Sequence, residues 1–418
     1  MIEEKDTRAI IVGLNFGQRK YFEHSMDELK SLTEACNMEV VGIMVQSLPH
    51  PDAATYMGSG KIEELTQLAH NMEAEYVIFE DNLSPAQLKN IKNILKVEVW
   101  DRTTLILEIF TLRARTREAR LQVESAYLQY MLPRLTGMWA HLGRQGGGGG
   151  SRANKGEGET QIELDRRQIR HRIDELGREL KLIEKTRQTQ RSGRDKGDIK
   201  KVALVGYTNA GKSTIMNALL EKSNASEEKK VFKKDMLFAT LDTSIRLVKT
   251  EDNRDFLLSD TVGFIENLPH DLVKAFHSTL EEAIFADLLL IVIDASDEFH
   301  SQHKAVTENT LKEIKADTIP RIYVMNKADK IEGIGFEIPR IQGDTIFISA
   351  EYQKGLDELT HLVQDTLYGK KILIEKLIPY NRGDLLNLLH SKAKVLSEEY
   401  TPEGIYVKAE CKEQLLNF

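Results

Sequence analysis

The sequence is poor in the features that mark disulfide-rich, zinc-binding or membrane-spanning proteins. Only two cysteines occur among 418 residues, Cys36 and Cys411, and neither belongs to a CxxC motif or a Cys/His cluster. This usage excludes a disulfide framework and gives no zinc signature. The most apolar stretch, LLLIVI at residues 288–293, falls far short of the roughly 20 residues that cross a bilayer. We therefore expect a buried strand there and no membrane span.

The chain also lacks an excess of positive charge. Its formal net charge is -8 and its pI is about 5.9. Such a protein is not a general polyanion binder, so we expect no DNA partner, and any contact with nucleic acid must use a local basic patch. The first residues, MIEEKDTRAIIVGL, place acids where a signal peptide carries a basic segment. We expect a cytoplasmic monomer, with peripheral association at a membrane left open.

The length predicts about three folding units at roughly 150 residues per domain. Short apolar strings alternate with helix-period segments from residue 8 to about 100 and again from residue 199, which is typical of parallel α/β sheets. Ser84 followed by Pro85 predicts a helix start. The predicted fold class is α/β multidomain. Its segments are residues 1–102 (a parallel α/β domain), 103–196 (a helical hairpin), 197–368 (a second α/β domain) and 369–418 (a small α+β module).

The segment 103–196 has helix-length patterns on both sides of a glycine-rich loop. Residues 103–131 contain neither glycine nor proline and precede Pro133, and a second pattern runs from about 159 to 190, which together predict a long antiparallel hairpin. Its tip, residues 141–160, includes five consecutive glycines that cannot pack a core. A flexible linker is one interpretation. Four basic or titratable side chains in the tip favour a contact surface instead: His141, Arg144, Arg152 and Lys155.

The final segment predicts a strand at LIPY, a helix over 382–400 and a strand at GIYVKAEC, with no evident chemistry.

Residues 206–213, GYTNAGKS, match the GxxxxGK[ST] motif between the apolar string VALV and the helix-forming STIMNALLE. In this motif main-chain N–H groups surround phosphate oxygens, Lys212 reaches the β and γ phosphates, and the Ser213 hydroxyl ligates Mg²⁺. A glycine-rich turn without a ligand is the alternative. The predicted phosphate-contacting residues are Gly206, Tyr207, Thr208, Asn209, Ala210, Gly211, Lys212, Ser213 and Thr214.

A second motif, DTVG at residues 260–263, follows the apolar string FLLS and supports the nucleotide interpretation. Asp260 at a strand end can support Mg²⁺, and the Gly263 N–H can reach the γ-phosphate. Thr261 and Val262 complete this loop. In the segment FATLDTS we expect Thr240 to bind Mg²⁺ and the γ-phosphate, with Thr243 in reserve. The predicted catalytic residues are Lys212, Thr240 and Gly263, and the predicted metal ligands are Ser213, Thr240 and Asp260.

The third motif, NKAD at residues 326–329, identifies the base. The Asp329 carboxylate can accept from the guanine ring N–H and the exocyclic amine together, a donor pair that adenine lacks. Lys327 would cover the base with its apolar stem, and Asn326 would link this loop to the P-loop. Ser349 and Ala350 match the last base-contacting loop, where the Ala350 N–H can meet the guanine carbonyl. The domain at 197–368 is therefore predicted to be a Ras-like P-loop G domain that binds GTP and GDP with Mg²⁺.

Two P-loop and switch positions modify this prediction. Phe264 stands where many GTPases have the glutamine that orients the attacking water, and a phenyl ring cannot hydrogen-bond that water. We therefore expect slow intrinsic hydrolysis that a partner accelerates. Asn209 stands where potassium-activated GTPases carry asparagine, so stimulation by K⁺ is a hypothesis.

Over nearly its full length the chain resembles the HflX family of bacterial ribosome-associated GTPases, in the Obg-HflX-like superfamily of the TRAFAC class. The resemblance rests on long, unusual strings: YMGSGKIEEL, DRTTLILEIF, RARTREARLQVE, LPRLTGMWAHLGRQGGG, GEGETQIELDRR, GYTNAGKST, LFATLD and DTVGFI. It implies binding to the large ribosomal subunit and its rRNA and separation of stalled or idle ribosomes during stress. It also gives Arg144, Arg152 and Lys155 a use as RNA contacts, although SRANKGEGE departs from the family's usual loop string.

Gly58-Ser-Gly-Lys61 raises an alternative, because some family members are reported to use ATP through this region. Thr55 stands where a P-loop needs its first glycine and Ile62 where it needs Ser or Thr, which argues against an ATP site. An ATP-dependent rRNA-remodelling, helicase-like factor with the GTPase as regulator is the competing hypothesis. A tRNA-modification or membrane-associated GTPase is disfavoured by the missing CxxC and apolar anchor.

Overall fold

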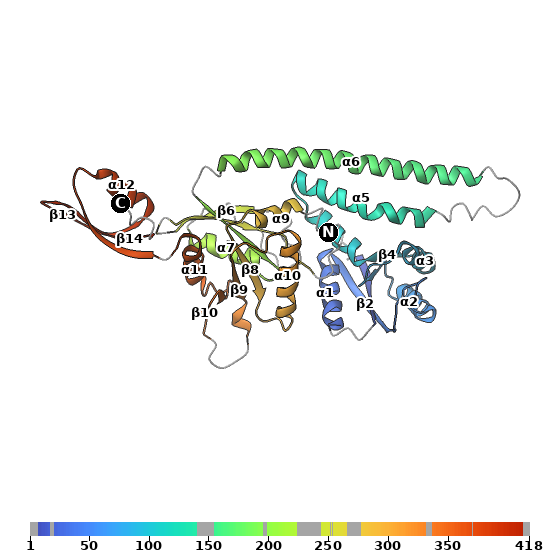
Figure 1. Cartoon of the computed structure of the whole chain (residues 1–418). Helices are drawn as coiled ribbons and strands as arrows, with labels where there is room; N and C mark the ends of the chain where they lie inside the picture. The colour runs from blue at the N-terminus through green and yellow to red at the C-terminus, as the bar shows by residue number, and fades with distance from the viewer. Residues whose placement is uncertain are drawn as a thin grey trace, which may run out of the picture. The chain divides into compact units, whose positions relative to one another are not determined.

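The computed structural model describes residues 7–16, 21–139, 154–194, 199–223, 244–250, 252, 254–265, 277–331, 337–369 and 371–412 (Figure 1). The chain forms two compact units, one mainly from Met1–Thr189 and the other mainly from residues 190–418.

The first unit contains a four-stranded parallel sheet in the order β2-β1-β3-β4. The buried parts of its central strands, AIIVGL at residues 9–14 and VIF at residues 77–79, carry no polar side chain, as expected for parallel strands covered on both faces. At the start of α3, Ser84 and Gln87 form a capping box and Pro85 takes the first helical position, as the sequence predicts. The parallel α/β domain is confirmed. Its elements are β1 (Thr7–Asn15), α1 (Phe22–Ala35), β2 (Met38–Ser47), α2 (Ser59–Asn71), β3 (Tyr76–Phe79), α3 (Pro85–Leu95) and β4 (Glu98–Asp101).

Three helices follow, and they correct the prediction of one helix over 103–131. The helix breaks at Ala114, whose N–H closes the last turn on Phe110 O but whose own backbone is extended. The next helix then continues through Pro133 instead of stopping there. Arg134 donates to Tyr130 O and to Leu83 O, which holds the turn after the proline in helical form. None of the described helices is both long and apolar enough to span a membrane. The elements are α4 (Arg102–Arg113), α5 (Arg117–Trp139) and α6 (Asn154–Arg194).

Helices α5 and α6 form the predicted antiparallel hairpin (Figure 1). Ion pairs join the two helices in antiparallel register: Arg172 to Glu124 at 2.7 Å and Arg187 to Glu118 at 2.6 Å. Leu176 of α6 is fully buried. Because exposed ion pairs contribute about 0–1 kcal/mol each, apolar contacts stabilise the hairpin and the ion pairs mainly fix its register.

The second unit contains a seven-stranded sheet in the order β10-β11-β9-β8-β5-β7-β6. The five central strands are parallel, as the alternation of apolar strings and helix-period segments from residue 199 predicts. The antiparallel edge strands β6 and β10 are short, β6 is mostly half-buried and β10 is exposed, and no pattern in the sequence predicted them. The elements are β5 (Lys200–Gly206), α7 (Lys212–Lys222), β6 (Ser244–Val248), β7 (Phe256–Asp260), α9 (His277–Ile284), β8 (Leu288–Asp294), α10 (His300–Glu313), β9 (Arg321–Asn326), η2 (Ala328–Lys330), β10 (Arg340–Gln342), β11 (Thr345–Phe347) and α11 (Leu356–Tyr368).

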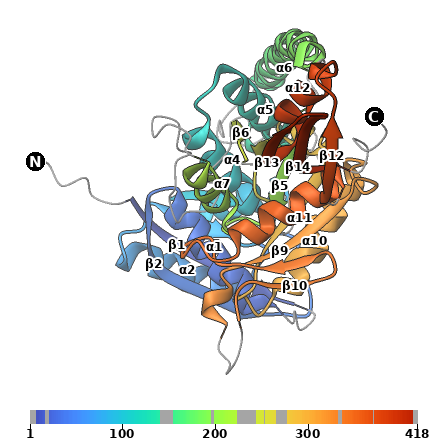
Figure 2. The same cartoon turned by 90° about the vertical axis from the view of Figure 1, so that its left-hand side faces the viewer.

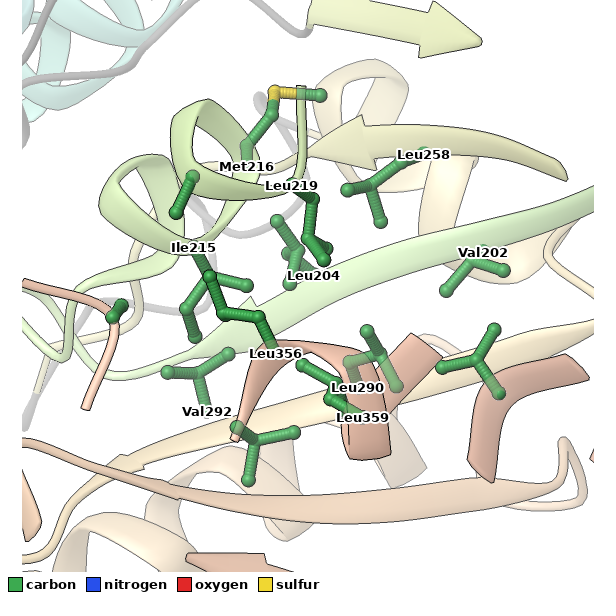
Figure 3. Packing of buried hydrophobic residues seen from close by; sticks show 14 of the residues in the cluster. Val202, Leu204, Ile215, Met216, Leu219, Leu258, Leu290, Val292, Leu356 and Leu359 are labelled. Carbon is green, nitrogen blue, oxygen red and sulfur yellow. The ribbon is translucent and has the colours of Figure 1, made fainter. Parts of the chain in front are cut away.

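Apolar side chains of α7 and α11 pack onto this sheet in one cluster (Figure 3). Ile215 and Leu219 of α7 and Leu359 of α11 are buried against Leu204 and Leu290 of the central strands. This core holds the carboxyl ends of the parallel strands at one edge of the sheet, where ligands bind in open α/β sheets.

The C-terminal module is a three-stranded antiparallel sheet in the order β12-β14-β13 with α12 on one face (Figure 2). The predicted helix over 382–400 is wrong in its second half, because α12 ends at Lys392 and the chain turns into a strand. Val395 and Val407 then pack in the core beneath α12, and this pairing with a distant strand overrides local helix propensity. The elements are β12 (Lys371–Ile378), α12 (Gly383–Lys392), β13 (Lys394–Thr401) and β14 (Gly404–Lys412).

Candidate nucleotide site

The P-loop joins β5 to the N-terminus of α7, and its two motif glycines are required by close contacts. Gly206 has φ +149°, and a Cβ there would lie 2.2 Å from Val292 O. Gly211 has φ +94°, and a Cβ there would lie 2.2 Å from Asn326 Nδ2. Any side chain at either position would push β8 or the base loop away from the P-loop.

Lys212 turns back over the P-loop from the first turn of α7. Its Nζ donates to Gly206 O at 3.0 Å and to Tyr207 O at 2.7 Å. Burial lowers the pKa of Lys212 from 10.5 to about 8, while the charge of Asp260 acts in the opposite direction. The Lys212 ammonium group is therefore held at the phosphate site, where nearby negative charge does not offset the cost of its burial. The phosphates of a bound nucleotide would supply that negative charge.

This pKa predicts a pH-dependent affinity. Below pH 8 Lys212 is protonated in the free protein, whereas above it binding must take up a proton because bound phosphates favour the charged form. The Kd for GDP should be flat below pH 8 and should then rise, by at most about tenfold per pH unit. Titration with a fluorescent GDP analogue from pH 6.5 to 8.8 measures this, and calorimetry in buffers of different ionisation enthalpy measures the proton uptake. A flat Kd with no proton uptake at pH 8.5 would contradict it.

Two of the three predicted metal ligands lie together. The Ser213 hydroxyl, at the start of α7, donates to Asp260 Oδ2 at 2.6 Å, at the carboxyl end of β7. A hydroxyl and a carboxylate are the hard oxygen ligands that Mg²⁺ prefers, so the residues present fit this ion. Thr240 and its reserve Thr243 lie outside the described residues.

The DTVG loop pairs with the P-loop in a way that the motifs do not reveal. Thr208 N–H donates to Phe264 O at 2.8 Å, and Phe264 N–H donates to Gly206 O at 3.0 Å. Gly263 is thereby held beside the P-loop. The Thr261 hydroxyl donates to Leu204 O at 2.7 Å inside the sheet, so only the main chain of Thr261 faces the nucleotide side. Val262 is also buried.

Phe264 cannot take part in orienting water. Its side chain is buried and its main chain is engaged by the P-loop. Slow intrinsic hydrolysis remains a prediction. So does stimulation by K⁺, for which Asn209 is exposed on the P-loop turn with φ +57°.

The base loop is connected to both neighbouring loops through Asn326. Its Nδ2 donates to Ala210 O at 3.0 Å, which is the predicted link to the P-loop. Its Oδ1 accepts from Ala350 N–H at 3.0 Å. The Ala350 N–H is also the group predicted to meet the guanine carbonyl. To do so it would have to donate to the guanine carbonyl and to Asn326 Oδ1 together. Asp329 follows in η2 with an exposed side chain.

Ser349 is fully buried and acts within its own loop. Its main chain pairs with Lys354 in both directions, and its hydroxyl accepts from Tyr352 N–H at 3.4 Å. Ser349 therefore shapes the loop that carries Ala350, and its side chain faces away from solvent.

Family models match three parts of the chain. A model described as "GTP-binding GTPase N-terminal" matches residues 23–111, "GTP-binding GTPase Middle Region" matches 113–194, and "50S ribosome-binding GTPase" matches 201–327. GTPase HflX of Caldanaerobacter subterraneus is 43% identical over 98% of this chain and 93% of its own length. The chain belongs to the HflX family of GTPases. It is thus a P-loop GTPase that binds guanine nucleotides.

Other HflX relatives match with similar coverage. The protein of Alkalihalophilus pseudofirmus is 39% identical over 99% of both chains, and that of Escherichia coli K12 is 39% identical over 95% of this chain and 91% of its own. A crystal structure titled a complex of SsGBP and GDP is similar with a TM-score of 0.49 at 26% identity, covering 87% of this chain and 98% of that one.

In this HflX-family site, sequence motifs gave no signal for two partners of motif residues. Lys327, in left-handed backbone at φ +58°, forms an ion pair with Asp294 Oδ2 at 2.8 Å. Burial raises the pKa of Asp294, but hydrogen bonds from Lys327 and Ser296 outweigh it, so the carboxyl group has a lowered pKa. The His303 ring stacks on Tyr207 with centroids 3.8 Å apart. These contacts fix Lys327 at the base and Tyr207 in the P-loop.

The structure says little about the residues predicted to contact RNA or ATP. Arg144 and Arg152 lie outside the described residues, and Lys155 lies in α6 with an undescribed side chain. Lys61 forms an ion pair with Glu64 on the outside of α2, at 2.5 Å. Lys212 instead folds back over its loop. The Lys61 arrangement does not resemble a P-loop lysine, and the ATP hypothesis remains an untested prediction.

Proposed function

We propose that this HflX-family GTPase binds the large ribosomal subunit in its GTP state and separates stalled or idle ribosomes, with hydrolysis driving release. The hairpin is the observation that supports this proposal. A helix of 41 residues, α6, pairs along α5 with fixed register, and a helix of this length spans roughly 60 Å. The basic residues of its connecting loop would then contact rRNA phosphates.

The half of α5 that leads to the tip is anchored to the sheet of the first unit. Asp101, fully buried at the end of β4, caps α4 by accepting from Thr104 N–H at 2.9 Å. The same carboxylate accepts from Tyr130 and Arg134 of α5. Breaking a buried pair of this kind costs several kcal/mol, about 3–5 when one partner is removed. The hairpin would therefore transmit force on its tip to the N-terminal sheet.

In the nucleotide site, each residue has one task. Main-chain N–H groups of the P-loop and Lys212 would hold the β and γ phosphates, and Ser213 and Asp260 would hold Mg²⁺ together with Thr240. Mg²⁺, when bound, neutralises charge that develops on the phosphates. Asp329 would select guanine. The Gly263 N–H would donate a hydrogen bond to the γ-phosphate. Hydrolysis removes that phosphate, and the DTVG loop would then lose this contact with the nucleotide.

A ribosome profile tests the proposal. Ribosomes incubated with the protein and a non-hydrolysable GTP analogue should move from joined ribosomes to free subunits on a sucrose gradient, with the protein in the large-subunit fraction. GDP should not produce this change. A variant with Arg144, Arg152 and Lys155 replaced by alanine should bind more weakly and lose affinity less steeply with salt, because fewer counterions are released. Absence of the GTP-loaded protein from ribosomal fractions at moderate salt would exclude the proposal.

A further inference from the structure

Thr208, the third residue of the P-loop motif, carries a hydroxyl without a partner. The residue is only 6% exposed, and Oγ1 makes no hydrogen bond among the described residues. Three neighbouring polar side chains do have partners: Lys212 donates to two carbonyls, Ser213 donates to Asp260 Oδ2, and Asn326 bonds to two loops. A buried hydroxyl without a partner is unfavourable, and valine would fill the same volume without this penalty.

The surroundings of Thr208 identify where a partner would come from. A Cβ added to Gly263 would lie 2.8 Å from both Cα and Cγ2 of Thr208 and 3.0 Å from Lys212 Nζ. The Thr208 side chain therefore borders the same small space as Gly263 and the Lys212 ammonium group. Both of these groups act on the γ-phosphate in P-loop GTPases.

A rotation of 120° about the Cα–Cβ bond moves the threonine hydroxyl into the position of the methyl group and the methyl group into that of the hydrogen. In this structure Cγ2 faces Gly263. A change of χ1 between staggered positions would place Oγ1 there instead, with no movement of the P-loop backbone, which Thr208 N–H holds on Phe264 O. The hydroxyl can thus reach toward a group that is present in one nucleotide state and absent in the other.

We propose that the Thr208 hydroxyl donates a hydrogen bond to an oxygen of the γ-phosphate and so makes the site prefer GTP over GDP. GDP has no such oxygen and leaves Oγ1 without a partner. This assignment concerns the side chain and is separate from the phosphate contacts of the P-loop main chain. It rests on the guanine-nucleotide site and does not depend on the ribosomal proposal.

The test compares Thr208→Val, which keeps the shape and removes the hydroxyl, with Thr208→Ser, which keeps the hydroxyl. Affinities for fluorescent GDP and for a non-hydrolysable GTP analogue are measured for both variants and the parent. Thr208→Val should bind GDP within about twofold of the parent and the GTP analogue about tenfold more weakly or worse, the loss expected for one hydrogen bond to a charged group. Thr208→Ser should retain the preference of the parent for GTP.

Thermal unfolding of the nucleotide-free protein separates this role from a structural one. Thr208→Val should unfold at the same or a higher temperature than the parent, since it removes an unsatisfied polar atom. An unchanged ratio of GTP-analogue to GDP affinity in Thr208→Val would overturn the proposal. So would an equal loss for both nucleotides, which would indicate a distorted P-loop. If the valine variant fails to fold, Thr208→Ala against Thr208→Ser gives the same comparison.

Discussion

Replacing Asp329 by asparagine is expected to weaken GTP binding by about a thousandfold and to create an affinity for XTP. A carboxylate that accepts two hydrogen bonds from guanine contributes strongly to affinity, and an amide in its place leaves one guanine donor facing another donor. Xanthine carries a carbonyl at that position and accepts from the amide. Asn326 and the link from Ala328 N–H to Ile348 O at 3.1 Å hold the loop independently of the Asp329 side chain. The exchange should therefore leave the fold unchanged.

Competition of GTP and XTP for a fluorescent guanine nucleotide measures this reversal of preference. Asp344→Asn is a matched control, because this carboxylate lies before β11 and is exposed, away from the base loop. It should leave both affinities unchanged. A variant at Asp329 that prefers GTP over XTP as strongly as the parent would show that this carboxylate does not recognise the base.

Replacing Gly263 by alanine should reduce GTP hydrolysis by about a hundredfold or more while GDP binding changes little. The added methyl group would lie 2.8 Å from Thr208 Cα and 3.0 Å from Lys212 Nζ, closer than atoms pack. The Thr208 backbone cannot yield without losing the hydrogen bond to Phe264 O. The DTVG loop would therefore move away from the γ-phosphate site, and the Gly263 N–H would no longer reach it. A loss of one positioned donor costs roughly 10²–10³ in rate.

Single-turnover hydrolysis and GDP titration on the same preparation separate the two effects. Gly383→Ala is the matched control, since a Cβ at Gly383 would meet nothing within 4 Å. Neither Gly383 nor Gly263 has a left-handed φ, so the two variants differ in the close contact and not in backbone strain. If the Gly263 variant hydrolyses GTP at the rate of the parent, the added methyl group is accommodated beside Thr208 without moving the Gly263 N–H, and the prediction is wrong.

The three nucleotide motifs were predictable because each follows a parallel strand. The P-loop begins at the end of β5, Asp260 and Asn326 are the last residues of β7 and β9, and the carboxyl ends of neighbouring parallel strands meet at one edge of the sheet. Apolar strings of the sequence are long enough to identify these buried strands. The residues between motifs, in contrast, gave no pattern for β6, whose side chains are mostly half-buried, or for β10, whose side chains are exposed.

Contacts between distant segments escaped sequence analysis for a common reason. Asp294 meets Lys327 and His303 meets Tyr207 only because the core places β8, β9, α10 and the P-loop side by side. Nothing in the spacing of these residues requires either pair. Similarly, the break at Ala114 and the strand after Lys392 depend on packing that local propensity does not contain.

The Asn326 side chain connects the purine end of the pocket to the phosphate end. A single amide group holds the P-loop through Ala210 O and the last base-contacting loop through Ala350 N–H. Because one side chain makes both contacts, a movement of the Asn326 amide disturbs the P-loop and the last base-contacting loop together. A partner that displaced this side chain would loosen the pocket at both ends of the bound nucleotide at once.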